Sequence, residues 1–99
     1  MNRNLKKFNG KVVIISGASS GIGKALAFEF ADNGALVVLA ARRENELNKI
    51  EAEIKKCEGE AYSVKVDVKK VEDCKDLVDK TIEKYGKIDV LINNAGISM

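Results

Sequence analysis

Histidine is absent from this 99-residue sequence, and only two cysteines occur, Cys57 and Cys74. The lack of histidine removes the commonest general base and the commonest metal ligand, and no cluster of carboxylates takes its place. The cysteines form no C-x-x-C pattern. We therefore expect them to be small apolar residues on helices, and we expect neither a disulfide nor a metal site.

A surplus of charge is also missing. The 17 lysines and arginines are interleaved with 15 acidic residues, so the net charge is only +2, which is too small and too dispersed to predict nucleic-acid binding. Every apolar run is much shorter than about 18 residues, the length that a membrane-spanning helix needs. The basic residues near the N-terminus are not followed by the apolar segment of a secretory signal. The sequence predicts one small cytoplasmic domain.

The most informative segment that is present is the glycine-rich stretch SGASSGIG at 16–23. It follows the apolar run at 12–15 and leads into an apolar helix pattern at 25–28. A strand, a tight turn and a helix start in this order bring together bare backbone N–H groups and the positive end of a helix dipole. Such a site suits a diphosphate.

The three glycines have distinct expected uses. Gly17 lets the chain turn off the strand, Gly21 allows a ligand to approach closely, and Gly23 lets the helix lie near the sheet. The spacing G-x-x-x-G-x-G differs from the commonest dinucleotide loop, G-x-G-x-x-G. A nucleotide-hydrolysing P-loop is disfavoured, because Ala18 and Ala25 stand where its first glycine and its magnesium-binding hydroxyl belong. The alternative without a ligand is an ordinary tight turn.

Strand and helix patterns alternate along the whole chain. Apolar runs predict strands at 12–15, 36–40, 61–68 and 90–92, and helical periodicity predicts helices at 21–33, 44–58 and 71–85. This is an α/β pattern with parallel crossovers. With right-handed crossovers and strand order 3-2-1-4, the first two helices cover one face of the sheet and the third covers the other. A ligand is expected where the order reverses, between strands 1 and 4.

Each predicted helix has an apolar stripe that we expect to face the sheet. The stripes are Ile22, Leu26 and Phe30; Leu47, Ile50, Ile54 and Cys57; and Val71, Cys74, Val78, Ile82 and Tyr85. The more alternating third strand is expected at one edge of the sheet. The fourth strand is expected at the other edge, beside an apolar face with little to cover it, which predicts association or poor order in isolation.

With these motifs the sequence resembles the short-chain dehydrogenase/reductase family from about residue 8 to residue 99. The family loop T-G-x-x-x-G-I-G is present with Ser16 in place of threonine, and the family motif N-N-A-G stands intact at 93–96. Asp67 and Val68 match the family position that meets the adenine ring. The resemblance implies a Rossmann-like, doubly wound parallel sheet. It also implies that residues 1–99 are the N-terminal, partial NAD(P)-binding domain, which ends after strand 4.

The resemblance also implies a role for each motif. The loop residues expected at the pyrophosphate are Gly17, Ser19, Ser20, Gly21, Ile22 and Gly23. Asp67 would accept a hydrogen bond from the adenine amino group beside the Val68 backbone, unless it is a solvated residue at a strand end. The residues expected at the ribose and nicotinamide are Asn94, Ala95 and Gly96. The amide of Asn93 or Asn94 is expected to tie the fourth strand to the glycine loop.

The end of the second strand bears on the choice of cofactor. A site that prefers NAD places a carboxylate there for the ribose 2′-hydroxyl. This chain has the neutral Ala41 followed by Arg42 and Arg43, whose guanidinium groups suit a 2′-phosphate. We therefore predict NADP(H), with NAD(H) less favoured. The alternative is that the arginines are solvated and that Glu44 competes with them.

The family's catalytic serine and Tyr-x-x-x-Lys pair lie well beyond strand four. Tyr62 is followed four residues later by Val66, and Tyr85 by Asp89, so neither tyrosine begins that motif. The resemblance therefore implies an NADP(H)-dependent oxidoreductase that transfers hydride between nicotinamide and a carbonyl or secondary alcohol. The 99 residues alone are expected to be inactive, and the parent enzyme is expected to be a homo-oligomer.

Two other functions stay open from the residues. The chain would otherwise be a nucleotide-binding module without catalysis, or part of another Rossmann-like enzyme such as a methyltransferase. The arginines disfavour the last, because an adenosyl ribose diol prefers an acidic partner. Steroids, sugars, fatty-acyl thioesters and small ketones all stay open as substrates.

Overall fold

A computed structural model describes residues 7–94 and shows strands and helices in strict alternation. The elements are β1 (Val12–Ser16), α1 (Gly21–Asp32), β2 (Leu36–Ala41), α2 (Glu44–Lys56), β3 (Glu60–Lys65), α3 (Val71–Tyr85) and β4 (Val90–Asn93). Their types and order are those predicted. The main difference is β3, which ends at Lys65 rather than Val68 because Asp67 turns the chain: its carboxylate accepts the backbone N–H of Lys69.

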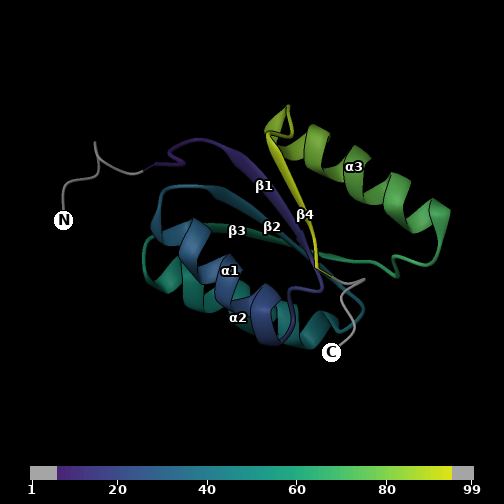
Figure 1. Ribbon diagram of the computed structural model, residues 1–99, viewed down its shortest axis with the longest axis horizontal. Coiled ribbons are helices and arrows are strands. Elements are labelled where there is room, and N and C mark those ends of the chain that lie inside the picture. Colours follow the sequence, from purple (N-terminus) through teal and green to yellow (C-terminus); the bar gives the residue numbers. More distant parts are fainter. Residues whose placement is uncertain (1–6, 95–99) are drawn as a thin grey trace.

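The four strands form one parallel sheet in the order β3-β2-β1-β4. This confirms the doubly wound arrangement and places β3 and β4 at the two edges. Figure 1 shows α1 and α2 against one face of the sheet and α3 against the other. The carboxyl ends of β1 and β4 therefore lie side by side, with Ser16 opposite Asn93, where the strand order reverses.

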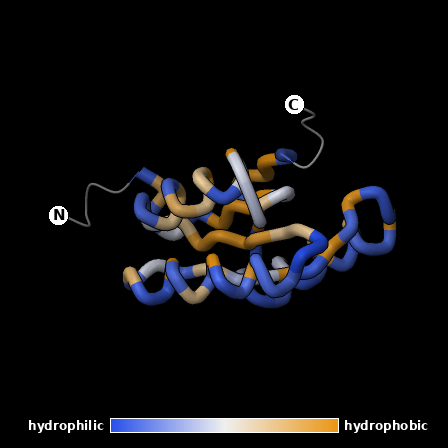
Figure 2. Tube along the Cα trace, turned by 90° about the horizontal axis from the view of Figure 1, so that it is seen from below, coloured by the Kyte–Doolittle hydropathy of each residue, from blue (hydrophilic) through white to orange (hydrophobic). Residues whose placement is uncertain are grey.

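The core consists of two layers separated by the sheet. Val13 and Ile15 belong to the layer with α1 and α2, whereas Val12 and Ile14 belong to the layer with α3. All five residues of β1 are buried, as expected for a central parallel strand that is covered on both faces. Figure 2 shows the hydrophobic residues concentrated along the strands in the middle of the molecule.

The predicted face of α1 was correct only in part. Its buried residues are Gly23, Ala27 and Ala31, whereas Ile22 is 54% exposed. The small residues let the helix axis approach the sheet closely, and Leu26 and Phe30 pack half-buried at the margin of the core. The size of the side chains decided which face of α1 turned inward, and a pattern of hydrophobic positions does not contain that information.

The stripe of α2 was correct except at its end. Leu47, Ile50 and Ile54 are buried, but the helix ends at Lys56, so Cys57 lies beyond it and is exposed. Both cysteines are free thiols. The expectation of an apolar, helical Cys57 is therefore corrected.

The predicted face of α3 was wrong over most of its length, although Tyr85 packs against the core. Leu77 and Thr81 are its buried residues, whereas Val71 is 80% exposed and Val78 and Ile82 are both exposed. On the neighbouring β4 edge, Leu91 is 64% exposed. Within residues 7–94, most of the apolar residues of α3 therefore do not face the sheet. Together with Leu91 they leave an exposed apolar surface on this side of the molecule.

The edge strand β4 is held to β1 at its beginning as well as along its length. The backbone N–H of Val12 donates to a carboxylate oxygen of Asp89 (2.8 Å), and the N–H of Asp89 donates to the carbonyl of Val12 (2.9 Å). The bond from Val12, followed by that from Lys87, lowers the pKa of Asp89 below its ordinary value.

Candidate functional site

The turn between β1 and α1 needs glycine at two positions for backbone reasons. Gly17 and Gly21 have φ angles of 66° and 57°, a left-handed conformation in which a Cβ is strained. The side-chain amide of Asn94 donates to the carbonyl of Gly17 (3.2 Å) and so ties the end of β4 to this turn. Of the two predicted candidates, Asn94 is the one that makes this contact.

Gly23 is needed for a different reason. A Cβ placed there would overlap the carbonyl oxygen of Gly17 and would lie 2.7 Å from the amide nitrogen of Asn94. At the buried Gly23, α1 therefore packs directly on the backbone of the loop, whereas the prediction for this glycine was an approach of the helix to the sheet. A side chain at Gly23 would push the helix away from the turn.

The N-terminus of α1 lacks internal partners of the usual kind. Ser20, the N-cap residue, makes no side-chain capping hydrogen bond, and the first turn of α1 contains no acidic residue. By contrast, the first turn of α2 contains Glu44 and Glu46, and that of α3 contains Glu72 and Asp73. Because the first N–H groups of a helix have no intrahelical acceptor, the start of α1 favours an anion from outside the helix.

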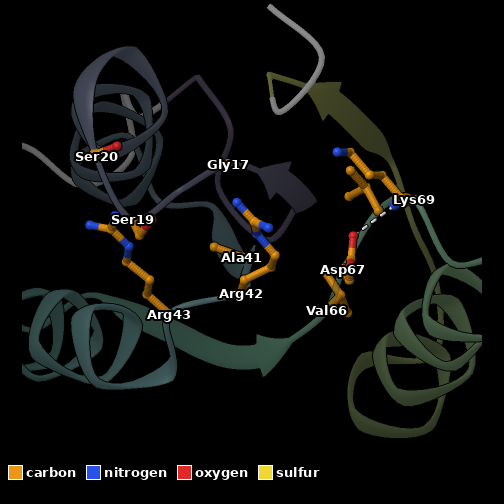
Figure 3. Close-up of a pocket in the computed structure, with 10 residues that line it drawn as sticks. Gly17, Ser19, Ser20, Ala41, Arg42, Arg43, Val66, Asp67 and Lys69 are labelled. Atoms are coloured by element: carbon orange, nitrogen blue, oxygen red, sulfur yellow. Dashed lines mark hydrogen bonds between the residues drawn. The ribbon is translucent and has the colours of Figure 1, made fainter.

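A pocket of about 290 Å³ opens beside this turn (Figure 3). The predicted site residues that line it are Gly17, Ser19, Ser20, Arg42, Arg43, Asp67 and Val68. They come from three loops at the carboxyl ends of β1, β2 and β3. Ala41, Val66 and Lys69 also line the pocket. Lys69 was missed because no motif contains it, although its place two residues after Asp67 was a usable signal.

The pocket is rich in positive charge. Figure 3 shows the side chain of Arg43 extending from the end of β2 toward Ser19, and that of Arg42 extending on the side of Gly17. Within residues 7–94 neither arginine forms a salt bridge. Asp67 is the one acidic residue in the lining. Glu44 lines a separate depression on the far side of Arg43.

Other predicted residues lie outside the pocket lining. Gly21, Ile22 and Gly23 form the start of α1, and Asn94 stands behind Gly17, whereas Ala95 and Gly96 fall outside the described residues. Behind the turn, the buried Ser16 hydroxyl lies 3.1 Å from the side-chain oxygen of Asn93 and 3.3 Å from the carbonyl of Ile92. The hydroxyl at 16 therefore joins β1 to β4 and does not face the pocket.

The two tyrosines lie away from the pocket, at the β3 edge. Their rings meet edge to face at 6.4 Å, and the Tyr85 hydroxyl donates to Glu60 at 2.9 Å. Burial, and then Glu60, raise the pKa of Tyr85 far above its ordinary value. Tyr85 is thus engaged with Glu60 and does not line the pocket.

Comparison with known proteins agrees with the fold. The model of the short chain dehydrogenase family matches residues 11–99. The chain belongs to this family. None of the helices in residues 7–94 is both long and apolar enough to cross a membrane.

Individual relatives are oxidoreductases. An uncharacterized oxidoreductase of Listeria monocytogenes is 58% identical over 87 residues, which are 88% of this chain and 35% of the relative. The structure of a hydroxysteroid dehydrogenase from Escherichia coli superposes with a TM-score of 0.87 at 35% identity, over 94% of this chain and 39% of that one. A metagenomic short-chain oxidoreductase in complex with NADP gives a TM-score of 0.86 at 38% identity, over 91% and 41%. The chain thus spans well under half the length of these proteins.

Proposed function

We propose that this chain is the cofactor-binding part of an NADP(H)-dependent short-chain oxidoreductase. The observation that carries the proposal is the pocket at the carboxyl ends of β1, β2 and β3, where an acid-free helix start meets two arginines. Family membership supports nicotinamide chemistry. The NADP complex of a similar structure supports the phosphorylated form of the cofactor.

The residues present fit such a group. The turn from Gly17 to Gly21 and the start of α1 would hold the pyrophosphate through backbone N–H groups, with Ser19, Ser20, Ile22 and Gly23 shaping the loop. Asp67 and Val68 would meet the adenine, and Asn94, Ala95 and Gly96 the ribose and nicotinamide. A bound nicotinamide nucleotide supplies the hydride, while these residues bind and orient it.

The choice of NADP(H) over NAD(H) rests on Arg42 and Arg43. A 2′-phosphate carries negative charge and several acceptor oxygens, which suit guanidinium groups that have no salt-bridge partner among residues 7–94. Ala41 places no carboxylate at the end of β2, so a 2′-phosphate would meet no repulsion there.

We propose that the whole protein transfers hydride to or from a carbonyl or secondary alcohol, and that residues 1–99 alone lack this activity. The place of Tyr85 outside the pocket and the absence of a Tyr-x-x-x-Lys pair from residues 1–99 support catalysis by residues of a longer chain. Residues of a longer chain could also pack on the exposed apolar side chains of α3 and β4. We also propose a homo-oligomeric parent, by analogy with the family, and a cytoplasmic one, since two free thiols suit a reducing compartment.

A binding titration tests the cofactor. The chain is expected to bind NADPH more tightly than NADH, and R42A is expected to weaken NADPH binding about tenfold without changing NADH binding, because it removes a charge-assisted contact to the 2′-phosphate. K49A serves as the matched control, because Lys49 is an exposed cation that pairs with Glu46 on α2. Equal affinities for the two cofactors, or an equal loss in K49A, would contradict the assignment.

The gene distinguishes an enzyme from a binding module. A Tyr-x-x-x-Lys motif about 55 to 65 codons beyond Gly96, as the family pattern implies, supports the oxidoreductase. A stop codon directly after Met99 would favour a module that binds nucleotide without catalysis. Carbonyl reduction by the 99 residues alone would contradict the proposed division of roles.

A further inference from the structure

The loop between β3 and α3 is held by a short series of hydrogen bonds. Asp73, in the first turn of α3, accepts the backbone N–H of Asp67 at 2.9 Å. Asp67 in turn accepts the N–H of Lys69 at 3.0 Å through its side chain and the N–H of Lys70 at 2.9 Å through its carbonyl. The start of α3 and the loop are thus joined by a carboxylate that belongs to the helix.

Asp73 stands behind the pocket and is not part of its lining, which the loop supplies through residues 66–69. One side-chain oxygen of Asp67 is engaged by Lys69. No residue of the described range bonds to its other oxygen. Asp67 is half-buried, so the direction in which this second oxygen points depends on how the Asp67 peptide is held.

We propose that Asp73 is a positioning residue for the adenine side of the site. By accepting the Asp67 N–H, it fixes the peptide from which the Asp67 carboxylate extends, so that one oxygen closes the loop and the other is available to a donor in the pocket. This inference rests on the proposed nucleotide-binding function. It adds a residue outside the pocket that acts through Asp67.

An acid in the first turn of a helix also has a general effect, because it interacts favourably with the helix dipole. Glu72 separates the two effects. It lies in the same turn with the same charge, is exposed, and makes no hydrogen bond within residues 7–94. Loss of Glu72 therefore removes the dipole interaction alone, whereas loss of Asp73 removes both that interaction and the bond to Asp67.

The test compares D73A, D73N and E72A in the 99-residue protein by NMR. Adenosine 2′,5′-bisphosphate and inorganic pyrophosphate are the probes, and amide exchange at Asp67 reports the bond without any ligand. We expect D73A to weaken the bisphosphate about tenfold and to accelerate Asp67 exchange by a similar factor, with pyrophosphate affinity unchanged. D73N keeps an acceptor oxygen and is expected to stay within about twofold of the wild type, as is E72A.

Each outcome bears on a separate claim. Equal losses in D73A and E72A, or an equal loss for both probes, would overturn the positioning role and leave the nucleotide site standing. If D73A does not fold, D73N carries the test, because accelerated exchange at its Asp67 amide would overturn the inference. Failure of the unaltered chain to bind the bisphosphate would instead reject the proposed function, and the inference with it.

Discussion

The N-termini of α1 and α3 both follow a parallel strand, yet they are completed in opposite ways. The first turn of α3 contains Glu72 and Asp73, and Asp73 accepts a backbone N–H from the loop before it. The first turn of α1 contains no acid, and its N-cap, Ser20, makes no side-chain capping bond. The start of α3 supplies its own negative charge, whereas the start of α1 has none.

On the proposed function, this difference separates a structural helix start from one that binds an anion. A helix N-terminus is stabilised by negative charge from whatever source provides it. At α3 the source is the helix itself, and the result is a closed loop. At α1 the source has to be external, and the neighbouring Arg42 and Arg43 add further attraction for an anion. On that proposal, the same backbone geometry serves two purposes according to the side chains in one turn.

The largest effect is expected from disturbing the close packing of α1 on the turn before it. G23A places a Cβ against the carbonyl of Gly17, and we expect a loss of about 2 kcal/mol in unfolding free energy, measured by urea titration, together with loss of NADPH binding. G21A is the control. It meets open space and bears only backbone strain, so about 1 kcal/mol is expected. Equal losses in the two variants would show that packing on Gly17 is unimportant.

An intermediate effect is expected from giving α1 the acid that α3 has. I22D places a carboxylate in the first turn at an exposed position, where it favours the helix dipole but repels phosphate. Relative to the neutral I22N, we expect about tenfold weaker NADPH binding at low salt, with the difference shrinking as salt is added. If the ratio of the NADPH dissociation constants of I22D and I22N does not change with salt, the cofactor phosphates do not approach this turn.

The smallest effect is expected from low pH, which protonates carboxylates such as Asp89, whereas the first turn of α1 has none. Because the pKa of Asp89 is lowered in the folded protein, its stabilising effect is present above its ordinary pKa of 3.8 and is lost as the pH falls through the folded value. Urea titrations at pH 7 and pH 3 should show this loss in the wild type and a smaller one in D89N. Equal losses would show that the bond from Val12 contributes no pH-dependent stability.

Glu51 is expected to add to the same acid loss. Its burial acts to raise its pKa, but hydrogen bonds from Lys55 and Ser63 outweigh that effect and lower the pKa overall. Its contribution therefore also disappears toward low pH.

The sequence predicted the types and order of the elements because their signals are local. Apolar runs, helical periodicity and glycine punctuation each act over a few residues, and β1 and α2 follow them closely. The predictions of which face of α1 and of α3 is buried were inaccurate for non-local reasons. Gly23 and its small neighbours allow close approach to the sheet, and the sheet under α3 is only partly covered.

The candidate site divides in the same way. The glycine loop, Arg42 and Asp67 were visible from the sequence because each stands at a strand end in a known pattern. Lys69 and Asp73 were not, because their places depend on how the loop after β3 closes through hydrogen bonds. The assignment of individual residues to cofactor atoms stays a prediction.

By itself the sequence determined an α/β chain of one family, with a turn that suits phosphate, because spacing and residue type carry that information along the chain. The tertiary structure decided which face of each helix is buried, which acid closes the β3–α3 loop, and that three separate strand ends share one pocket. Those outcomes depend on distances between residues far apart in sequence, which only the packing of helices on the sheet establishes.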